Sequence, residues 1–383
     1  MNIIILGNGF DLAHGLETKY SNFLDYCKYY QPENNISEYN KINDEFNNIT
    51  TNNLWIKIFN AIKSDSDNWI DLEIQIYKVL VLFSYYCSIN ELSVDIIKSV
   101  NFLHNQLHEI LIQTIKDSKW DFIHFHDGKY NDKFIINDIN KMSSILYNEL
   151  RTFIKCFELY CFFVINKQID NIAKGNNYKL NLPIFNVINK NHSNSTYIIN
   201  FNYTSTFNSL YHNQLFSEVR HDIKYSFIHG KINDNLPIDF NKKVINSNQI
   251  ILGTQNFDRK SIDKNFPMAI NQFQKYNQRH KYRTVDEYQK LLSSLKMSNK
   301  NDHRIHVVGH SLEKSDHGIL KNIFKANNYS KIIIYYYNEN SHQKYLDNIT
   351  EILGEEDVDM RVIFTDLKDK QYGFLIPNDI KHI

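Results

Sequence analysis

The hydrophobic positions follow two different patterns along the chain. Short and nearly continuous apolar runs predict strands that are buried on both faces of a parallel sheet, and they occur at residues 2–6, 197–201, 225–228, 250–252, 304–308, 332–337 and 361–364. Between residues 54 and 174 the apolar residues recur at helical spacing, and no strand is expected there. A helix expected at 315–326 separates two strand runs, which indicates parallel pairing.

These patterns predict an α/β fold with a Rossmann-like, mostly parallel sheet and a large helical insertion. We expect one α/β unit over residues 1–383, with a core from residues 1–30 and 190–383 and the insertion at 31–189. The most apolar stretch, residues 74–89, contains Gln75 and Lys78 and is too short to cross a bilayer, so it predicts a buried helix.

Composition narrows the classes of function. The chain has 383 residues, with 43 Lys and Arg against 43 Asp and Glu, so no overall field draws a polyanion and nucleic-acid binding is not favoured. The most basic segment, residues 275–283 (KYNQRHKYR), is interpreted as a solvated helix face. The four cysteines form no C-x-x-C pair, which argues against a zinc knuckle and favours a reducing cytoplasm. No signal peptide or membrane contact is expected.

The first strand run ends in a glycine turn, GNGFD, at residues 7–11. Glycines between a strand and a helix let the backbone approach a phosphate, but a simple tight turn needs them equally. Asp11 in the first turn of a helix is favourable for the helix dipole. The functional alternative is a carboxylate that faces a sugar hydroxyl or a water molecule.

Polar residues also follow the strand runs at 197–201 and 225–228. Asn202 and Thr204 come directly after the first of these runs, where ligands bind to open α/β sheets. Helix capping accounts for one hydroxyl, that of Thr204 or Ser205, but not for Asn202. His229 precedes a glycine after the second run, and it is either a structural histidine or a general base.

Two further motifs carry polar groups. The run at 304–308 leads into Gly309, His310 and Ser311, and Asp316 follows at the expected helix start, where capping is the simplest reading. The motif WIDLE at residues 69–73 places Asp71 and Glu73 two residues apart, so the two carboxylates do not share a helix face. It is interpreted as a solvated helix start.

These motifs occur together and in one order, as GNGFDLAHGLETKYSNFL, WIDLE, INFNYT, IHG and VVGHSLEKSDHGIL. In this arrangement the chain resembles the bacterial abortive-infection AbiH family over nearly its whole length. The resemblance implies defence against bacteriophage in a bacterial cytoplasm. A phage-derived trigger and a homo-oligomer are both compatible with it.

The strand-end motifs are also similar to those of sirtuin-like NAD-processing domains. That similarity implies NAD as substrate or ligand, with Asn202 and His229 as the catalytic pair. It implies nucleotide contacts from Gly7, Asn8, Gly9, Phe10, Thr204, Gly309, His310, Ser311 and Asp316. The chain departs from the pattern at Phe10–Asp11, where a small residue or Ser is usual, and at Thr204, where Asp is usual. It also lacks the zinc cysteines of the protein deacetylases, so deacetylation and a bound metal are not expected.

Three hypotheses follow. In the first, the protein cleaves the N-glycosidic bond of NAD or a related nucleotide: His229 is the general base, Asn202 orients water or the ribose, and Asp11 stabilises an oxocarbenium-like centre. In the second, the same pocket senses a nucleotide without turnover. In the third, a metal-dependent nuclease uses carboxylates and a histidine, which the neutral charge disfavours, and its candidate residues are Asp11, Asp71, Glu73, His229 and Asp316.

Overall fold

The computed structural model describes residues 1–29, 40–63, 72–87, 122–127, 130–136, 139–174, 196–211, 223–232, 250–254, 268–297 and 303–366. The chain divides into two compact units. The core unit consists of residues 1–19, 160–251 and 279–383, and the helical unit of residues 20–159 and 252–278. The helical unit therefore takes in most of the expected insertion and a second, later segment of the chain.

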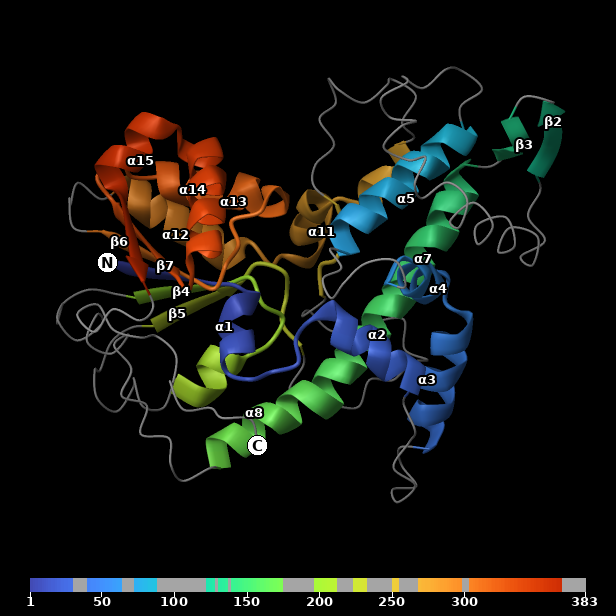
Figure 1. Ribbon diagram of the computed structural model, residues 1–383, viewed down its shortest axis with the longest axis horizontal. Helices are drawn as coiled ribbons and strands as arrows, with labels where there is room; N and C mark the ends of the chain where they lie inside the picture. The colour runs from blue at the N-terminus through green and yellow to red at the C-terminus, as the bar shows by residue number, and fades with distance from the viewer. Residues whose placement is uncertain are drawn as a thin grey trace. The chain divides into compact units, whose positions relative to one another are not determined.

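The core unit is built on a six-stranded parallel sheet with the order β5-β4-β1-β6-β7-β8 (Figure 1). Its strands are β1 (Asn2–Leu6), β4 (Thr196–Asn200), β5 (Ile223–Phe227), β6 (Arg304–Val308), β7 (Lys331–Tyr336) and β8 (Val362–Asp366). When these strands are renumbered in chain order, the sheet order is 3-2-1-4-5-6. The α/β class and the parallel sheet are thus confirmed.

Six of the seven expected strands are present within two residues of their expected bounds. The seventh expectation, a strand at 250–252, is wrong. Ile250, Ile251 and Leu252 are buried, and the Ile251 amide donates a hydrogen bond to the His229 carbonyl at 2.8 Å, but the three residues join no strand of the sheet. A run of three apolar residues is as compatible with a buried loop as with a strand.

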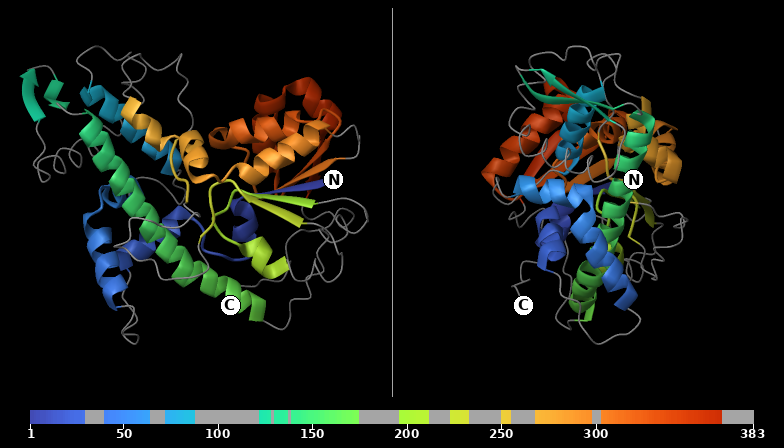
Figure 2. Two further views of the ribbon diagram at one scale, coloured as in Figure 1. Left: turned by 180° about the vertical axis from the view of Figure 1, so that it is seen from behind. Right: turned by 90° about the vertical axis from the view of Figure 1, so that its right-hand side faces the viewer.

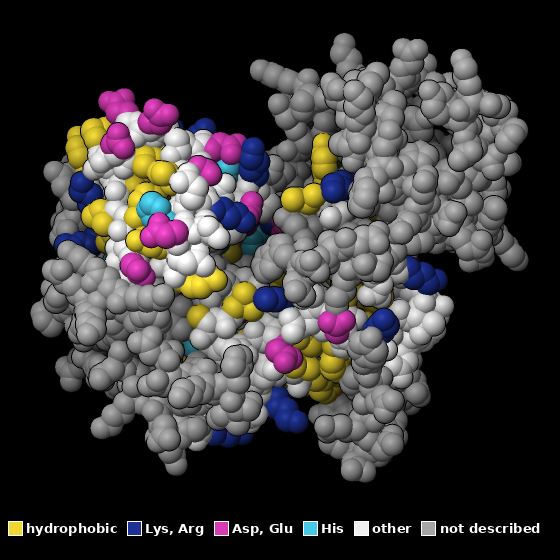
Figure 3. Space-filling view, in the orientation of Figure 1, with side chains coloured by type: hydrophobic (Ala, Val, Ile, Leu, Met, Phe, Trp, Pro, Cys, Tyr) yellow, Lys and Arg dark blue, Asp and Glu magenta, His cyan; other side chains and the backbone are white. Residues whose placement is uncertain are grey.

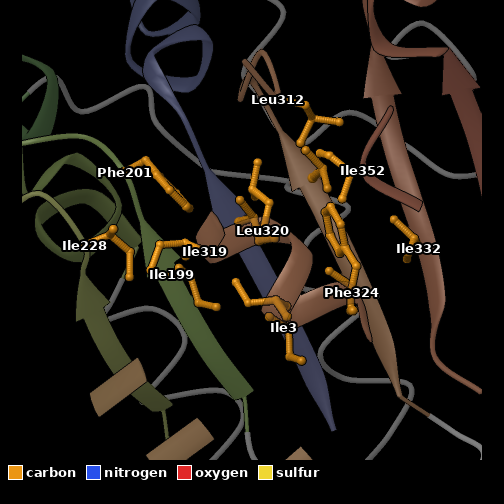
Figure 4. Close-up of a cluster of buried hydrophobic side chains, with 14 of the residues drawn as sticks. Ile3, Ile199, Phe201, Ile228, Leu312, Ile319, Leu320, Phe324, Ile332 and Ile352 are labelled. Carbon is orange, nitrogen blue, oxygen red and sulfur yellow. The ribbon is translucent and has the colours of Figure 1, made fainter. Parts of the chain in front are cut away.

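Both faces of the sheet are buried, which is why its strands read as continuous apolar runs. On one face, Ile3 and Ile5 of β1 pack in a cluster with residues of three helices, α12 (Asp286–Met297), α13 (His317–Lys325) and α14 (Glu339–Leu353). Figure 4 shows part of this cluster around Ile3, Phe201 and Leu312. On the other face, Ile4 and Leu6 pack with residues of α1 (Asn8–Ala13) and of the helical segment at 206–211. The two layers flank the sheet in Figure 2.

The core unit contains further short elements. They are a π-helical turn (Cys161–Ile165), α8 (Asn166–Lys174), a short 3₁₀ turn (Lys314–Asp316) and α15 (Glu355–Arg361). The helix expected at 315–326 is confirmed as α13 with that preceding turn. On the face of the core unit that Figure 3 displays, acidic and basic side chains are interspersed, with no large area of one sign.

The helical unit packs around aromatic side chains. Phe23 contacts Phe153 and Phe157 edge to face, and Trp55 lies against Phe59 and Phe273. Its elements are α2 (Tyr20–Tyr29), α3 (Asn40–Asn52), α4 (Leu54–Lys63), α5 (Leu72–Cys87), the hairpin of β2 (Phe122–Asp127) and β3 (Tyr130–Ile136), α7 (Ile139–Tyr160), a 3₁₀ helix (Met268–Phe273) and the start of α11 (Lys275–Tyr282). Within the described residues, no helix is both long and apolar enough to cross a membrane.

One expectation about residues 54–174 is wrong: the segment contains strands, because β2 and β3 form an antiparallel hairpin. Two further expectations hold in part. The solvated helix face expected at 275–283 is present at Tyr276, His280 and Arg283, but Lys275 is buried and contacts Glu73 at 2.5 Å, and Arg279 is buried as well. The buried helix expected at 74–89 is α5, whose described part exposes Ile74 and Tyr77. In α5 and α11, tertiary contacts decide which polar and apolar side chains face water.

Candidate functional site

The carboxyl ends of parallel strands meet at one edge of a sheet. At this edge the core unit gathers side chains from four strand ends, those of β1, β4, β5 and β6. They are Asp11, Asn202, Thr204, His229, His310 and Asp316, and all six are buried. Because each of these polar residues follows the end of a parallel strand in the sequence, the fold brings them to one edge of the sheet.

The two glycine turns pack directly on each other. A Cβ atom added at Gly7 would lie 2.4 Å from the His310 Cα, and one at Gly9 would lie 2.8 Å from the Gly309 Cα. Gly309 also has a φ of +65°, in the left-handed region. Close approach of two protein segments thus accounts for these glycines without any ligand.

Three backbone amides of the first turn already have protein acceptors. Gly7 donates to the Val308 carbonyl at 3.1 Å, Gly9 to the Gly309 carbonyl at 2.8 Å, and Phe10 to the Gly7 carbonyl at 2.9 Å. A phosphate bound to these amides would have to replace bonds that hold the two turns together. Phosphate binding at this turn therefore remains a prediction. The main physical objection is that a phosphate would compete with these three backbone hydrogen bonds.

Asn202 connects the end of β4 to the first turn. Its side-chain amide donates to the Gly7 carbonyl at 3.0 Å, and its backbone amide donates to the Asn200 side chain at 2.8 Å. The Asn200 side chain in turn donates to the Thr204 carbonyl at 2.9 Å. The polar residues after β4 thus hold the first turn and fix their own loop.

Asp11 is a buried carboxylate held by hydroxyl groups. The Thr204 hydroxyl donates to Asp11 Oδ2 at 2.5 Å, and the Thr206 hydroxyl donates to the Thr204 hydroxyl at 3.1 Å. Burial raises the pKa of Asp11 to about 6, although hydrogen bonding from Thr204, Thr206 and Asn202 opposes the rise. Near neutral pH a fraction of Asp11 therefore changes protonation with small changes in pH.

Two histidines face one carboxylate. His229 Nε2 lies 3.1 Å from Asp316 Oδ1, and His310 Nε2 lies 3.6 Å from Asp316 Oδ2. The expected capping role of Asp316 is wrong: the residue stands at the N-cap of α13, but its side chain makes no capping hydrogen bond. Phe201 packs edge-on against His310, with 4.2 Å between ring centroids, and against His229 at 5.5 Å. A buried His–Asp pair is a device for acid–base chemistry.

The other predicted site residues have separate places. The Asn8 side chain accepts a hydrogen bond from the Thr18 hydroxyl at 2.6 Å. Phe10 is buried in the second apolar cluster and contacts His14, with 4.5 Å between ring centroids. Ser311 is exposed, and its carbonyl accepts from Asn348 at 2.8 Å.

Sequence reasoning missed three contributors to this region. Thr206 supports Thr204, and Phe201 separates the histidines from the sheet core. His14 bonds to the Phe10 carbonyl at 2.7 Å and to the Tyr211 hydroxyl, and burial lowers its pKa to about 4. The four-residue spacing of Phe10 and His14 within FDLAH was the available signal, because it places both on one face of a helix.

Of the residues proposed for a nuclease, Asp11, His229 and Asp316 lie at the carboxyl edge of the core sheet. Glu73 contacts Lys275 within the helical unit, and Asp71 lies outside the described residues. In the part of the chain that the structure describes, no group of three or more His, Cys, Asp or Glu side chains has the arrangement of a metal site.

Comparison with known proteins agrees with the motif order. A family model described as bacteriophage abortive infection AbiH matches residues 3–337. Neither the curated proteins nor the solved structures give a significant match. The matched range contains every side chain of the buried site described above. The chain therefore belongs to the bacteriophage abortive infection AbiH family, and this membership indicates a role in defence against bacteriophage.

Proposed function

We propose that the protein is an abortive-infection effector that hydrolyses the N-glycosidic bond of NAD or a related nucleotide at the carboxyl edge of the core sheet. Loss of the nucleotide would halt metabolism in the infected cell. The observation that carries the proposal is the buried His229–Asp316 pair, joined at 3.1 Å, at this edge of the sheet.

The strand order supports a nucleotide as the ligand. The order 3-2-1-4-5-6 is that of doubly wound dinucleotide-binding sheets, in which the ligand lies outside the carboxyl ends of the strands where the order reverses. Here the reversal lies between β1 and β6. Asp11, Asn202 and His310 follow the ends of β1, β4 and β6.

The His–Asp pair supports proton transfer. A carboxylate that accepts a hydrogen bond from one imidazole nitrogen holds the ring in place and stabilises the imidazolium that forms when the other nitrogen takes a proton. In His229 the nitrogen assigned to proton transfer is Nδ1. Its role in the proposal is to take a proton from water as that water attacks the anomeric carbon.

Asp11 and Asn202 have complementary roles in the proposal. Departure of nicotinamide leaves positive charge on the ribose, and an ionised Asp11 stabilises that charge in a poorly solvated site. Asn202 orients the attacking water or the ribose and, through its bond to the Gly7 carbonyl, holds the turn that carries Asp11. With its pKa at about 6, Asp11 is mostly ionised above that pH.

A nucleotide sensor is the second candidate. It is favoured by the low exposure of His229 and Asp316, 4% and 8%, which limits access to water. A protein that only binds a nucleotide does not need a water molecule beside its histidine.

One experiment separates these functions. The purified protein is incubated with NAD, NADP, ATP and GTP, with and without EDTA, and products are separated by chromatography. We expect nicotinamide release that resists EDTA and is lost in His229→Ala and Asn202→Ala. His280→Gln, which changes an exposed histidine of α11, serves as the matched control.

The other outcomes are equally informative. Nucleotide binding in calorimetry without any product would support the sensor. Turnover that disappears with EDTA would contradict a metal-independent hydrolase and favour metal-dependent hydrolysis. Turnover that is unchanged in both His229→Ala and Asn202→Ala would overturn the proposed hydrolase.

A further inference from the structure

Leu312 has a strained backbone beside the buried histidines. Its φ is +57°, in the left-handed region that costs a non-glycine residue about 1 kcal/mol or more. Its amide donates to His310 Nδ1 at 3.0 Å, and its carbonyl accepts from His317 Nε2 at 2.9 Å. The side chain is fully buried in the apolar cluster of Figure 4, so the conformation is held from three directions.

The bond from Leu312 determines where His310 carries its proton. A backbone N–H donates only to a ring nitrogen without a hydrogen, so Nδ1 of His310 is unprotonated and the proton lies on Nε2. That Nε2–H faces Asp316 Oδ2 at 3.6 Å, which is longer than a hydrogen bond but close enough for attraction to a carboxylate.

The same reasoning applies to the second oxygen of Asp316. An ionised carboxylate only accepts hydrogen bonds, so His229 Nε2, 3.1 Å from Oδ1, carries a hydrogen. Asp316 thus lies between two ring N–H groups, one at each oxygen. Phe201 contacts both rings edge-on.

We propose that His310 is a positioning residue, which acts through Asp316 to hold His229 in the tautomer that has its hydrogen on Nε2 and its basic nitrogen at Nδ1. The basic role of His229 rests on the proposed function, whereas the tautomers do not. The inference also gives His310 a role other than nucleotide contact, because both of its ring nitrogens face protein groups. The strained Leu312 supplies the backbone amide that fixes the tautomer of His310, which in turn faces Asp316.

Two variants of His310 separate positioning from packing. His310→Phe keeps a ring beside Phe201 and removes both nitrogens. His310→Gln keeps a side-chain N–H near the position of Nε2, and its oxygen can accept the Leu312 amide. We expect His310→Phe to lower kcat at least about tenfold with little change in KM, and His310→Gln to recover most of the loss.

The tautomers are read directly by NMR of the full-length protein labelled with ¹⁵N-histidine. The signals of residues 229 and 310 are assigned by their loss in His229→Gln and His310→Gln. We expect both rings to be protonated at Nε2 in the wild type. In His310→Phe, a second population of His229 protonated at Nδ1 should appear, and in His310→Gln it should not.

Two results would overturn the inference: protonation of wild-type His310 at Nδ1, or an unchanged His229 tautomer in folded His310→Phe. If His310→Phe does not fold, protonation of wild-type His310 at Nδ1 would still overturn the inference. The NMR result is also independent of turnover. A wild-type protein that releases no nicotinamide but shows the expected tautomers would contradict the proposed hydrolase and retain the positioning role.

Discussion

Replacing Asp11 by Asn tests whether the protein keeps a charged group buried at a cost in stability. The Asp11 side chain is 1% exposed, and burial raises its pKa from 3.8 to about 6. The folded protein therefore binds this proton more tightly than the unfolded chain does. The free energy of unfolding falls as pH rises from about 4 to about 6, and the full penalty is present above that range.

The magnitude follows from the pKa difference. One pKa unit corresponds to about 1.4 kcal/mol, so a rise of roughly two units destabilises the folded state by about 3 kcal/mol at neutral pH. At pH 4 most of this penalty is absent, since Asp11 is protonated in the folded state and only slightly more than half ionised in the unfolded chain. Asn carries no charge at any pH. We therefore expect the stability of Asp11→Asn, relative to the wild type, to be about 2.5 kcal/mol higher at pH 8 than at pH 4.

The assay compares urea unfolding at pH 4 and pH 8 by circular dichroism. Hydrogen exchange of the β1 amides, Asn2–Leu6, reports on the core unit that carries Asp11. Any fixed cost of placing an amide beside Thr204 is the same at both pH values and cancels. Asp359→Asn, which alters an exposed residue of α15, should change stability by less than about 0.5 kcal/mol at either pH.

An equal effect of Asp11→Asn at both pH values would refute the reasoning, because it would mean that folding leaves the titration of this carboxyl unchanged. The same variant should also lose nicotinamide release, since a neutral amide cannot balance the charge of an oxocarbenium-like centre.

Two further predictions concern packing. Gly7→Ala should destabilise the core unit by about 3 kcal/mol, because the added Cβ meets backbone atoms of His310. In Gly318→Ala, in α13, the added Cβ meets nothing within 4 Å, and the variant should be more stable by up to about 1 kcal/mol. Urea unfolding measures both changes, and similar losses of stability would contradict the packing argument. Lys275→Met should destabilise the helical unit by about 3 kcal/mol, and adding Glu73→Leu should recover part of it. Tryptophan fluorescence follows that unfolding, since Trp55 is buried in the helical unit, and a double variant no better than the single one would contradict a direct ion pair.

The sheet was predictable because its strands are buried on both faces. Continuous β-branched runs such as NIIIL leave little choice of structure, and the strand ends followed from the first polar or glycine residue. These runs did not predict which strands lie next to each other in the sheet. The order β5-β4-β1-β6-β7-β8 depends on the crossover connections, which are long and carry no register information in the sequence.

The hairpin of β2 and β3 was missed although a local signal exists. Its sequence, FIHFHDGKYNDKFII, contains Asp127 followed by glycine, a common pair in tight hairpin turns. The strands carry polar and charged residues between their apolar ones, and the helical spacing on both sides dominated the interpretation. A two-residue turn signal should have taken precedence over the average pattern of the segment.

Local rules located the site residues, and tertiary contacts decided their partners. Asp316 occupies a helix N-cap, where the rule for short polar side chains predicts a bond to the helix backbone. The carboxylate instead faces His229, 87 positions earlier in the chain, and His310. The glycines of the first turn matched a pattern for phosphate binding, yet their close packing against Gly309 explains them equally well. In both cases the competing contact is long-range and has no local signature.

Three unfavourable features of the described core unit lie near the carboxyl edge of its sheet. A buried carboxyl with a raised pKa, a leucine in the left-handed region and a carboxylate between two buried histidines lie near the strand ends there. The apolar layers on the two faces of the sheet contain the helices and β-branched strands that simple rules predict. A fold selected only for stability would replace Asp11 with a neutral residue and Leu312 with glycine. Strained and charged groups near the edge where open α/β sheets bind their ligands support the proposal that the site lies there.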